Sequence, residues 1–542
     1  MRKIIFCFML VVAGMLLFTA CGNGGTPAAP EAEATPAPEE PAATPEPAEV
    51  IPPPEVPDAP PEEAPLGRGI VVAIGSDPPA IGPARHNALV GFYMTAMTHN
   101  GLFRICAQTL ESVPDLVSEW TAISDTVFEF TIHEGIPFHN GEIMTAYDVV
   151  ASLEYVRTYA YASAAHRSAQ SFEVVDEFTV RIDTGEPNSM LFVDLANQAN
   201  FIMPRSLIEA GNDFNENPVG SGPFVFQDWQ RGDSLYFTAF EEYFDAERRA
   251  RIESVTFRVI PEGFTRTMAL ETGEIDYNVL LQASDINRML DDPNMTVISV
   301  PGAQHNILYL NNDLPQFSTP YRRRAIGMAI DKEGMMLAAF DGTVNPTWVQ
   351  GPEVFAGSTF EGVYSFDPEG ALQLLEEHGV DPATMGFEII ASTPPRATMA
   401  TVVQANLAAI GIPVTIIQQD VATTQQLLGD GDFEAAFMGF TQPSMLGYLR
   451  AKFHSSSIGT TNRSRVNNPE LDALIDAAIA EVQSVEARIA LTEQAVRLVN
   501  EHAYQIPTHM AMLTRAYNSN LVIPEHPATD FPLYLNMAFW VE

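Results

Sequence analysis

The sequence predicts an α/β protein with more than one domain, and three observations lead to this prediction. Strand and helix patterns alternate between residues 367 and 440, which is typical of a parallel sheet covered by helices. Residues 127–156 combine an alternating strand, a tight turn and a helix with its own cap. The chain has 542 residues, 46% of them hydrophobic, which allows two to four domains with sizeable cores.

The first twenty residues read as a secretory signal peptide. Arg2 and Lys3 supply the positive start, and Ile4–Phe18 is an apolar run too short for a comfortable membrane span. The following Thr19-Ala20-Cys21-Gly22 resembles a bacterial lipobox, in which Cys21 becomes the lipid-modified N-terminus. The alternative is an ordinary signal peptide followed by a chance cysteine. Two or three acyl chains on Cys21 would hold the protein stably at a membrane.

Residues 21–66 are expected to form a lipid-anchored, disordered tether. They consist mainly of Pro, Ala, Glu and Thr, with no Lys or Arg before Arg68, so they offer almost nothing to bury. In a polyproline II conformation, at roughly 3.1 Å per residue, such a tether reaches on the order of 140 Å. Its expected role is to lift the folded part away from the membrane.

Charge and cysteine content exclude several classes of function. The net charge is −41, so the general field of the protein disfavours binding to nucleic acid or to an anionic membrane surface. After loss of Cys7 with the signal and modification of Cys21, only Cys106 remains, and no internal disulfide is possible. We expect Cys106 to be an inert buried thiol, because no activating partner can be identified.

The most informative stretch is Pro114–Val156. Apolar and polar residues alternate from Phe128 to His133, which predicts a half-buried strand. Asn140-Gly141 is a turn dipeptide, because both residues tolerate positive φ. Thr145 stands at a helix N-cap position with Asp148 three residues later, as in a capping box, and apolar residues then follow at helical spacing.

The remaining elements follow from the same patterns. Gly-rich residues 218–223 lack the Lys-Ser/Thr of a phosphate-binding loop, so we interpret them as a tight turn into a strand pair. Arg322–Arg324 form a dense basic run that is a candidate anion site, although a solvated helix start is the favoured interpretation. The predicted strands are 70–75, 128–133, 172–175, 178–182, 255–259, 295–300, 307–310, 387–391, 414–417, 433–440 and 508–513. The predicted helices are 89–97, 145–156, 190–196, 265–271, 321–335, 367–378, 399–410, 425–428, 468–475 and 486–499.

Several segments in this order resemble the family 5 extracellular solute-binding proteins, the peptide/nickel-type binding subunits of ABC importers. The opening stretch matches at Pro114, Leu116, Trp120, Gly135, Ile136, Phe138, His139, Asn140, Gly141, Thr145, Ala146, Asp148 and Val149. Further matches are residues 218–229, 273–276, 321–335 and 411–414. The resemblance covers roughly Ile70–Glu542, and it implies a two-lobed, type II periplasmic-binding-protein-like α/β fold with three subdomains and a hinged cleft between the lobes.

The resemblance also implies domain boundaries. The core of lobe I is expected at residues 67–110 with 215–304 and 503–542. An accessory subdomain of lobe I is expected at residues 111–214. Lobe II is expected at residues 305–502.

Candidate ligand contacts come from the same resemblance. His86 and Asn87, beside Arg85 and Ala88, fall in the loop after the first strand, which lines the cleft in the family, and His86 alone would more often be a surface loop residue. His305 and Asn306 fall near the hinge, and Trp348 lies in a loop that often faces the cleft, although a buried structural Trp is equally compatible. Phe440 occupies the position of a family Trp, followed by Thr441 and Gln442.

The segment after Phe440 departs from the peptide-binding members. In those proteins an Asp just after Gly-Trp holds the α-amine of the peptide, whereas this chain has Gly439-Phe440-Thr441-Gln442-Pro443. An ammonium group that enters a closed cleft without a counter-charge loses hydration at a high cost. We therefore expect a sugar, an N-blocked peptide or another polar solute rather than an ordinary oligopeptide.

No catalytic or metal-binding signature stands out. The sequence contains no HExxH, GxSxG or GxxxxGK[ST], and His502 and His509 are poorly spaced for a metal pair. His139 belongs to the family turn and is expected to pack locally. We expect neither enzyme activity, cofactor nor metal. An extracellular hydrolase of peptide or glycan is the alternative, and a ligand receptor for a sensor is a second one.

The sequence-based hypothesis is therefore a solute-binding protein on the outer face of a bacterial cell membrane. Its expected partners are a small-molecule or peptide ligand and the permease and ATPase subunits of an ABC importer. It is expected to touch the membrane only through its N-terminal lipid, to bind no nucleic acid and to be a monomer.

Overall fold

The structure is a computed structural model of the chain. It describes residues 66–83, 88–107, 110–159, 168–392, 394–524 and 533–541, all within one compact unit, Pro45–Glu542. The predicted signal peptide and the tether up to residue 65, which include Cys21, lie outside these described residues, and so do Arg85, His86 and Asn87.

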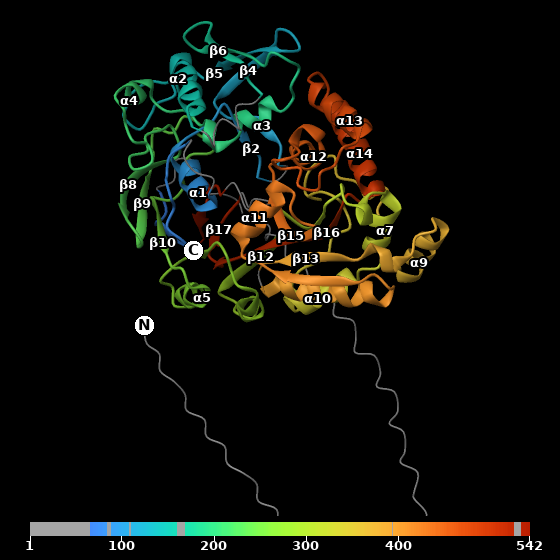
Figure 1. Ribbon diagram of the computed structural model, residues 1–542. Coiled ribbons are helices and arrows are strands. Elements are labelled where there is room, and N and C mark those ends of the chain that lie inside the picture. Colours follow the sequence, from blue (N-terminus) through green and yellow to red (C-terminus); the bar gives the residue numbers. More distant parts are fainter. Residues whose placement is uncertain are drawn as a thin grey trace, which may run out of the picture. The chain divides into compact units, whose positions relative to one another are not determined.

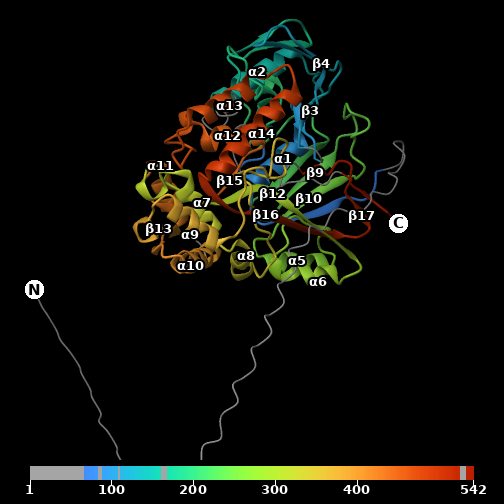
Figure 2. The ribbon, with the colours of Figure 1, turned by 90° about the vertical axis from the view of Figure 1, so that its right-hand side faces the viewer.

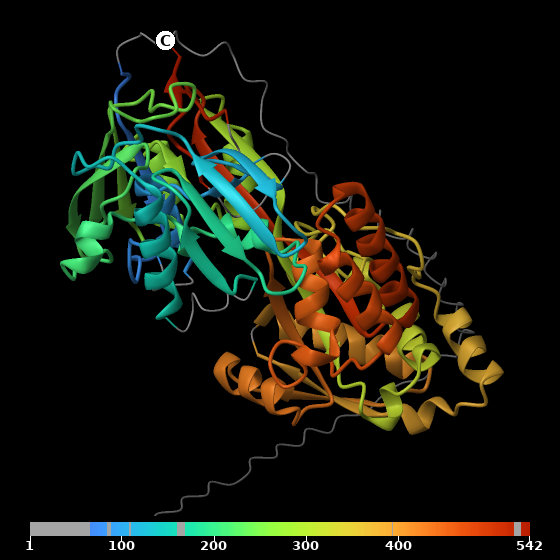
Figure 3. The same ribbon diagram turned by 90° about the horizontal axis from the view of Figure 1, so that it is seen from above.

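The largest sheet in the described part of the chain has ten strands (Figure 1). Their order is β14 (Val414–Gln418), β13 (Phe387–Ala391), β15 (Ala435–Thr441), β12 (Met295–Leu310), β16 (Gln505–Asn518), β11 (Tyr277–Asn278), β1 (Ile70–Ile74), β10 (Ser254–Val259), β9 (Ser234–Ala239) and β8 (Phe224–Gln230). The long strands β12 and β16 pair with each other in the middle. We call the part built on β1 and β8–β11 lobe I, and the part built on β13–β15 lobe II; Figure 3 shows the two lobes with long strands between them.

Lobe I is held together by apolar residues on both faces of its strands. On one face, Tyr93 and Met97 of α1 (Leu89–Thr98) pack with Val72 and Ile74 of β1. On the other face lie α5 (Gly263–Glu271) and α6 (Ile286–Leu290). Short strands complete this lobe: β2 (Phe103–Ile105) pairs with β3 (Ser112–Pro114), and β17 (Leu521–Val522) pairs with β18 (Phe539–Trp540).

The Gly-rich segment before β8 is a structural turn, as predicted. Gly222 N–H donates to Thr98 O at 2.9 Å, and a Cβ on Gly222 would lie only 2.5 Å from the backbone nitrogen of His99. A side chain at this position would therefore collide with the end of α1. This collision accounts for the glycine, so its presence does not indicate a phosphate-binding loop.

The accessory subdomain of lobe I is a four-stranded sheet with three helices among its described residues. Its strands run in the order β4 (Val117–Ala122), β5 (Val127–Ile132), β7 (Thr179–Asp183) and β6 (Ser171–Val174). Its helices are α2 (Ala146–Arg157), α3 (Leu191–Leu195) and α4 (Arg205–Glu209). The predicted capping box is confirmed: Thr145 N–H donates to the Asp148 carboxylate at 2.9 Å.

The predicted break between residues 300 and 307 is wrong, because β12 is one continuous 16-residue strand. Pro301 and Gly302 suggest a strand end in the sequence, yet the ladder with β16 only shifts its register between Pro301 and His305. A β-bulge absorbs the missing N–H of proline and lets the strand continue. The strand can therefore pass from lobe I into lobe II without a loop.

Lobe II has a parallel arrangement of β13 with β14 and β15, as the alternation predicted. Its helices are α7 (Pro320–Met328), α8 (Lys332–Phe340), α9 (Pro368–Glu377), α10 (Pro394–Ala409), α11 (Val421–Asp430), α12 (Met445–Phe453), α13 (Pro469–Ala480) and α14 (Val485–His502). Figure 2 shows α8 and α10 on one side of the sheet and α12–α14 on the other. The helix α12 was not predicted, because Gly447 interrupts its apolar pattern.

The basic run at the start of α7 is not a solvated helix start. Arg323 is buried, and its guanidinium donates to His502 O at 2.9 and 3.1 Å and to Phe317 O at 2.7 Å. Arg324 donates to Glu501 O at 3.2 Å. These two arginines satisfy carbonyl groups near the C-terminal end of α14, so they join α7 to α14.

Candidate functional site

Several predicted ligand contacts, on β12 and at the end of β15, lie close together where β12, β15 and β16 are neighbours in the sheet. His305 stands opposite Phe440, and Gln304 stands opposite Thr441, in the ladder of β12 with β15. On the other side of β12, Asn306 stands opposite His509 of β16. The structure therefore brings His305, Asn306, Phe440 and Thr441 together on neighbouring strands.

His305 is fully buried and lies in a polar layer beneath α12. Its Nδ1 is 2.7 Å from the hydroxyl of Tyr448, and that hydroxyl also accepts a hydrogen bond from Gln505 Nε2 at 2.9 Å. Burial lowers the pKa of His305 well below its usual value, and the nearby Lys452 lowers it further. The imidazole is thus neutral and fixes α12 against β12, instead of projecting into solvent.

Phe440 is half-buried, and the side chains of Tyr448 and Lys452 pack against its ring. Its ring centroid lies 5.9 Å from that of Tyr448, and Lys452 Nζ lies 4.8 Å from the Phe440 centroid. The same Nζ lies 3.5 Å from the centroid of Tyr309 and donates to the Tyr309 hydroxyl. Burial lowers the pKa of Lys452 well below its usual value. This layer holds Phe440 in one orientation and leaves part of its ring accessible.

The residues after Phe440 form the approach to α12. Thr441 and Gln442 are half-buried, and Ser444 caps the helix by accepting a hydrogen bond from Gly447 N–H at 3.1 Å. These residues offer hydroxyl and amide groups, and they introduce no carboxylate next to Phe440. Sequence reasoning missed Tyr448 and Lys452 because α12 was not predicted. Ser444 as an N-cap, with Tyr448 four residues later, was the available signal.

Trp348 belongs to a neighbouring cluster. It is half-buried, and the Nζ of the fully buried Lys332 lies 4.0 Å from the Trp348 ring, which is a cation–π geometry. Lys332 also donates to Thr347 O at 3.1 Å, and Thr347 N–H donates to Thr508 O at 2.9 Å. Trp348 is therefore attached to α8 and β16, and among the described residues its ring contacts Tyr364 and not Phe440.

Other predicted positions have local structural roles. His139 Nε2 lies 2.9 Å from Gly222 O and its ring packs edge-on against Phe240, as expected of a residue that packs locally. The loop that contains His86 and Asn87 falls in the gap between Pro83 and Ala88, outside the described residues. Cys106 is half-buried rather than buried, because it follows directly after the short strand β2.

A cavity of about 340 Å³ lies elsewhere, on lobe II beside α11. Apolar side chains and the carboxylates of Glu388, Asp432 and Glu434 line it, and it includes none of the predicted contact residues. Among the residues that the structure describes, no group of three or more His, Cys, Asp or Glu is arranged to hold a metal ion. No helix in that same part of the chain combines the length and apolar character needed to cross a bilayer.

Curated proteins with similar sequences are named as binding proteins. Heme-binding protein A of Haemophilus influenzae is 27% identical over 453 residues, which cover 76% of this chain and 81% of that protein. The glutathione-binding protein GsiB of Salmonella paratyphi A is 24% identical, over 84% of this chain and 91% of its own length. A probable D,D-dipeptide-binding periplasmic protein of Escherichia coli is 27% identical over 72% of this chain and 77% of its own length.

Solved structures share the fold over nearly all of their length. HbpA2 of Haemophilus parasuis superposes with a TM-score of 0.79 and 24% identity, over 88% of this chain and 100% of that chain. The murein tripeptide-binding protein MppA, in an unliganded open form, gives a TM-score of 0.77 at 21% identity, over 88% and 98%. The family model for the middle part of bacterial extracellular solute-binding proteins, family 5, matches residues 111–459. The chain therefore belongs to the family 5 bacterial extracellular solute-binding proteins.

Proposed function

We propose that this protein is the lipid-anchored binding subunit of an ABC importer, which captures a peptide-like or other polar small solute between its lobes. The observation that carries this proposal is the arrangement at the lobe junction. Two long strands, β12 and β16, join the lobes, and Phe440 is presented there on a rigid aromatic backing. A binding cleft needs apolar surface with a few fixed polar groups, and Thr441 and Gln442 supply them.

The chemistry beside Phe440 favours a ligand without a free α-ammonium group. Thr441 and Gln442 can bond to neutral groups, whereas no carboxylate follows Phe440 to compensate a buried ammonium. Relatives are named for heme, glutathione and D,D-dipeptides, so the family accommodates diverse ligands. We place N-blocked or side-chain-linked peptides, sugars and similar polar solutes ahead of ordinary oligopeptides for this chain.

Native mass spectrometry of the purified protein, followed by calorimetry on the solute that co-purifies, tests this proposal. Glutathione, heme, a D-Ala-D-Ala dipeptide and a set of oligosaccharides serve as the starting panel for calorimetry. Saturable binding at a ratio of one to one, without conversion of the ligand, is the expected result. Turnover of a peptide or glycan would instead favour the hydrolase alternative. A receptor for a sensor differs in lacking a partner permease, so a neighbouring permease gene supports import.

Replacing Phe440 by alanine is expected to weaken binding of the co-purifying solute about tenfold, or about 1.4 kcal/mol, because a fixed aromatic contact is lost. Trp348→Ala is expected to weaken binding as well. Phe360→Ala serves as the control, because Phe360 is an aromatic residue of lobe II that is 62% exposed and is not one of the predicted contacts. Unchanged affinity in both the Phe440 and the Trp348 variants would contradict this placement of the ligand.

We also propose that Cys21 carries the lipid anchor at the outer face of the cell membrane, that residues 21–66 form the tether, and that the mature protein is monomeric. We further propose that the boundaries between the core of lobe I, its accessory subdomain and lobe II fall after residues 110, 214, 304 and 502. Cys21→Ala is expected to move the protein from the membrane fraction to the soluble fraction and to abolish metabolic labelling with a fatty acid. Cys106→Ala, the control, should leave both unchanged. Continued membrane association and labelling of the Cys21 variant would contradict the anchor.

A further inference from the structure

We propose that the accessory subdomain carries a latch that holds the two lobes together when the cleft is closed. The latch consists of Asp125, Ser189 and Met190 on the accessory subdomain and of residues 478–483 on lobe II. It lies at the upper end of α13, where this helix approaches the accessory subdomain (Figure 1). The proposal rests on the two-lobed capture proposed above, and it assigns a function to a subdomain that contributes nothing to the ten-stranded sheet.

Ser189 acts as a helix cap supplied by the opposite lobe. The helix α13 ends at Ala480, and its C-cap residue Glu481 has an extended conformation, with φ −79° and ψ 94°. The last carbonyl groups of a helix lack partners within the helix. Ser189 N–H donates to Ile479 O at 2.7 Å, and the Ser189 hydroxyl donates to Ala478 O at 3.2 Å. Ser189 is only 4% exposed, so water does not replace it in this conformation.

Apolar contacts on both sides of Ser189 are reciprocal. Met190 of the accessory subdomain packs against the core formed by α12–α14, where its Cε lies 3.3 Å from the position of a Cβ on Gly447. Val482 of lobe II packs against the core of the accessory subdomain. Apolar side chains therefore cross between the lobes in both directions, and Ile105 and Leu110 of lobe I pack with the same core of lobe II as Met190. Opening of the lobes exposes these side chains.

The rim of the latch is polar. Gln483 Nε2 donates to Asp125 Oδ1 at 3.1 Å, and both residues are exposed. The carboxylate of Glu111 acts on the charge of Arg488 in α14. An apolar centre with two backbone carbonyl acceptors and a polar rim resembles a small transient interface rather than a continuous core. A few contacts of this kind change the ratio of closed to open protein by roughly tenfold to a hundredfold. Ligand binding can oppose or reinforce a change of that size.

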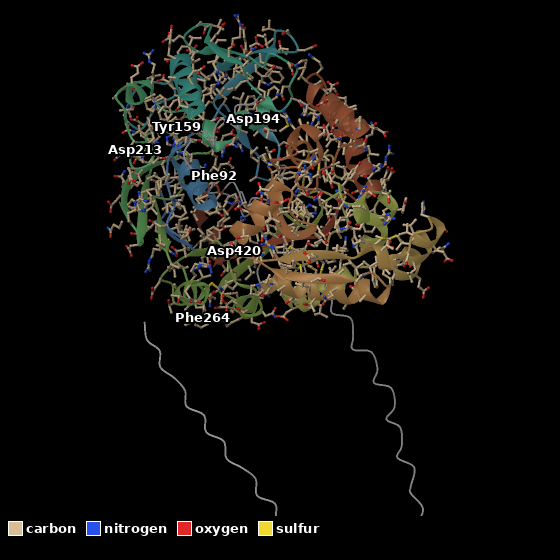
Figure 4. All side chains as sticks on the ribbon, viewed as in Figure 1. Phe92, Tyr159, Asp194, Asp213, Phe264 and Asp420 are labelled. Carbon is tan, nitrogen blue, oxygen red and sulfur yellow. The ribbon has the colours of Figure 1, made fainter. Side chains whose placement is uncertain are left out.

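The loop that carries Ser189 is fixed from its own side. Met190 N–H donates to Asn188 Oδ1 at 3.1 Å at the start of α3. Asp194 of α3, labelled in Figure 4, accepts a hydrogen bond from Ser168 on its carboxylate and from Asn200 Nδ2 on its backbone carbonyl, the latter at 2.6 Å. The loop is therefore preorganised to meet α13, so closure requires no refolding of the accessory subdomain.

Distance measurements by pulsed electron paramagnetic resonance on the full-length, ligand-free protein test the latch. Spin labels on cysteines at Ile123 and Glu486, exposed positions on the two sides, report the separation in a background in which Cys7, Cys21 and Cys106 are all replaced by serine. We expect a short and a long distance in equilibrium. The double variant Met190→Ser/Gln483→Ala should lower the ratio of short to long at least fivefold. Ser189→Ala, which removes only the hydroxyl, should lower it less.

Met268→Ser serves as the matched control, because Met268 is 38% exposed on α5 of lobe I and outside the latch; its distances should equal those of the parent protein. A single, unchanged distance in the parent and in the double variant would identify the contact as permanent and overturn the latch. Two distances whose ratio is the same in the parent protein and in the latch variants would overturn it as well. Thermal melting confirms that each variant folds. Because no ligand is added, failure to find a transported solute would not affect this result.

Discussion

Lowering the pH from 7.5 to 5.0 is expected to destabilise the folded protein strongly, because several histidines are buried in the neutral form. Burial, together with the smaller effect of the neighbouring His139, lowers the pKa of His99 to about 3. Burial also lowers the pKa of His139 and of His509 to about 4. The pKa of His305 is lowered in the same direction. In the unfolded chain these side chains have a pKa near 6.5.

The sign of the effect follows from proton linkage. Below pH 6.5 the unfolded chain takes up protons that the folded protein does not bind, so acid favours unfolding. The stabilisation is complete above pH 6.5 and is lost as the pH falls toward the folded-state values. At pH 5.0, His99, His139 and His509 each lower the free energy of unfolding by about 2 kcal/mol, which is about 6 kcal/mol together. That is a large part of the 5–15 kcal/mol that typically separates folded and unfolded states.

One buried carboxyl acts in the opposite direction. Burial raises the pKa of Asp115, although Arg248 and a hydrogen bond from Asn100 partly compensate. Protonation of Asp115 in acid therefore relieves part of the cost of its burial. Since a single carboxyl opposes four histidines, the balance still favours unfolding at low pH.

Guanidinium unfolding at pH 7.5 and at pH 5.0 measures this effect as a fall in the free energy of unfolding. His139→Asn should shrink the difference between the two pH values by about 2 kcal/mol, whatever it does to stability at pH 7.5. His133→Asn is the control, because His133 is exposed and six residues away on the same segment. An equal free energy of unfolding at both pH values would show that these histidines are hydrated or protonated in the folded protein.

Local chemistry in the sequence was sufficient to predict most elements and their order. The capping box at Thr145 and Asp148 and the parallel strands of lobe II depend on neighbouring residues and on periodicity, both of which are visible in one sequence. The resemblance to the family named His305 and Phe440 separately as candidate contacts. Their pairing on neighbouring strands came from the structure, because the two positions are far apart in the chain and local patterns cannot give it.

The errors share a physical cause, which is that long-range contacts outweigh local signals. Pro301-Gly302 reads as a strand end, yet pairing with β16 on either side carries β12 through it as a bulge. Gly447 weakens the pattern of α12, yet burial of Tyr448 against His305 stabilises that helix. The partners that decide these segments come from distant parts of the chain, so their sequences alone do not reveal them.

Distant partners also decide the role of the basic run at residues 322–324, because Arg323 bonds to carbonyl groups of Phe317 and His502. Arg323→Ala is expected to lower the free energy of unfolding by about 4 kcal/mol. The guanidinium makes three hydrogen bonds to two backbone carbonyls, at Phe317 and His502. Hydrogen bonds to charged groups contribute roughly 1.5–3 kcal/mol each after the exchange with water, and bonds that share one side chain do not add fully. Removal of the guanidinium leaves both carbonyls in a site that is nearly closed to solvent.

Arg322→Ala is the matched control for Arg323→Ala, because the two residues are adjacent on α7 and only Arg323 reaches the end of α14. The control should change stability by less than about 0.5 kcal/mol. Arg323→Lys should recover only part of the loss, since an ammonium group cannot reproduce the forked geometry that spans Phe317 and His502. Arg323 is only 3% exposed, and this burial lowers its pKa to about 10. Equal stability of the two alanine variants would mean that the hydrogen bonds of Arg323 do not stabilise the contact between α7 and α14, and that Arg323 is available for an anionic ligand.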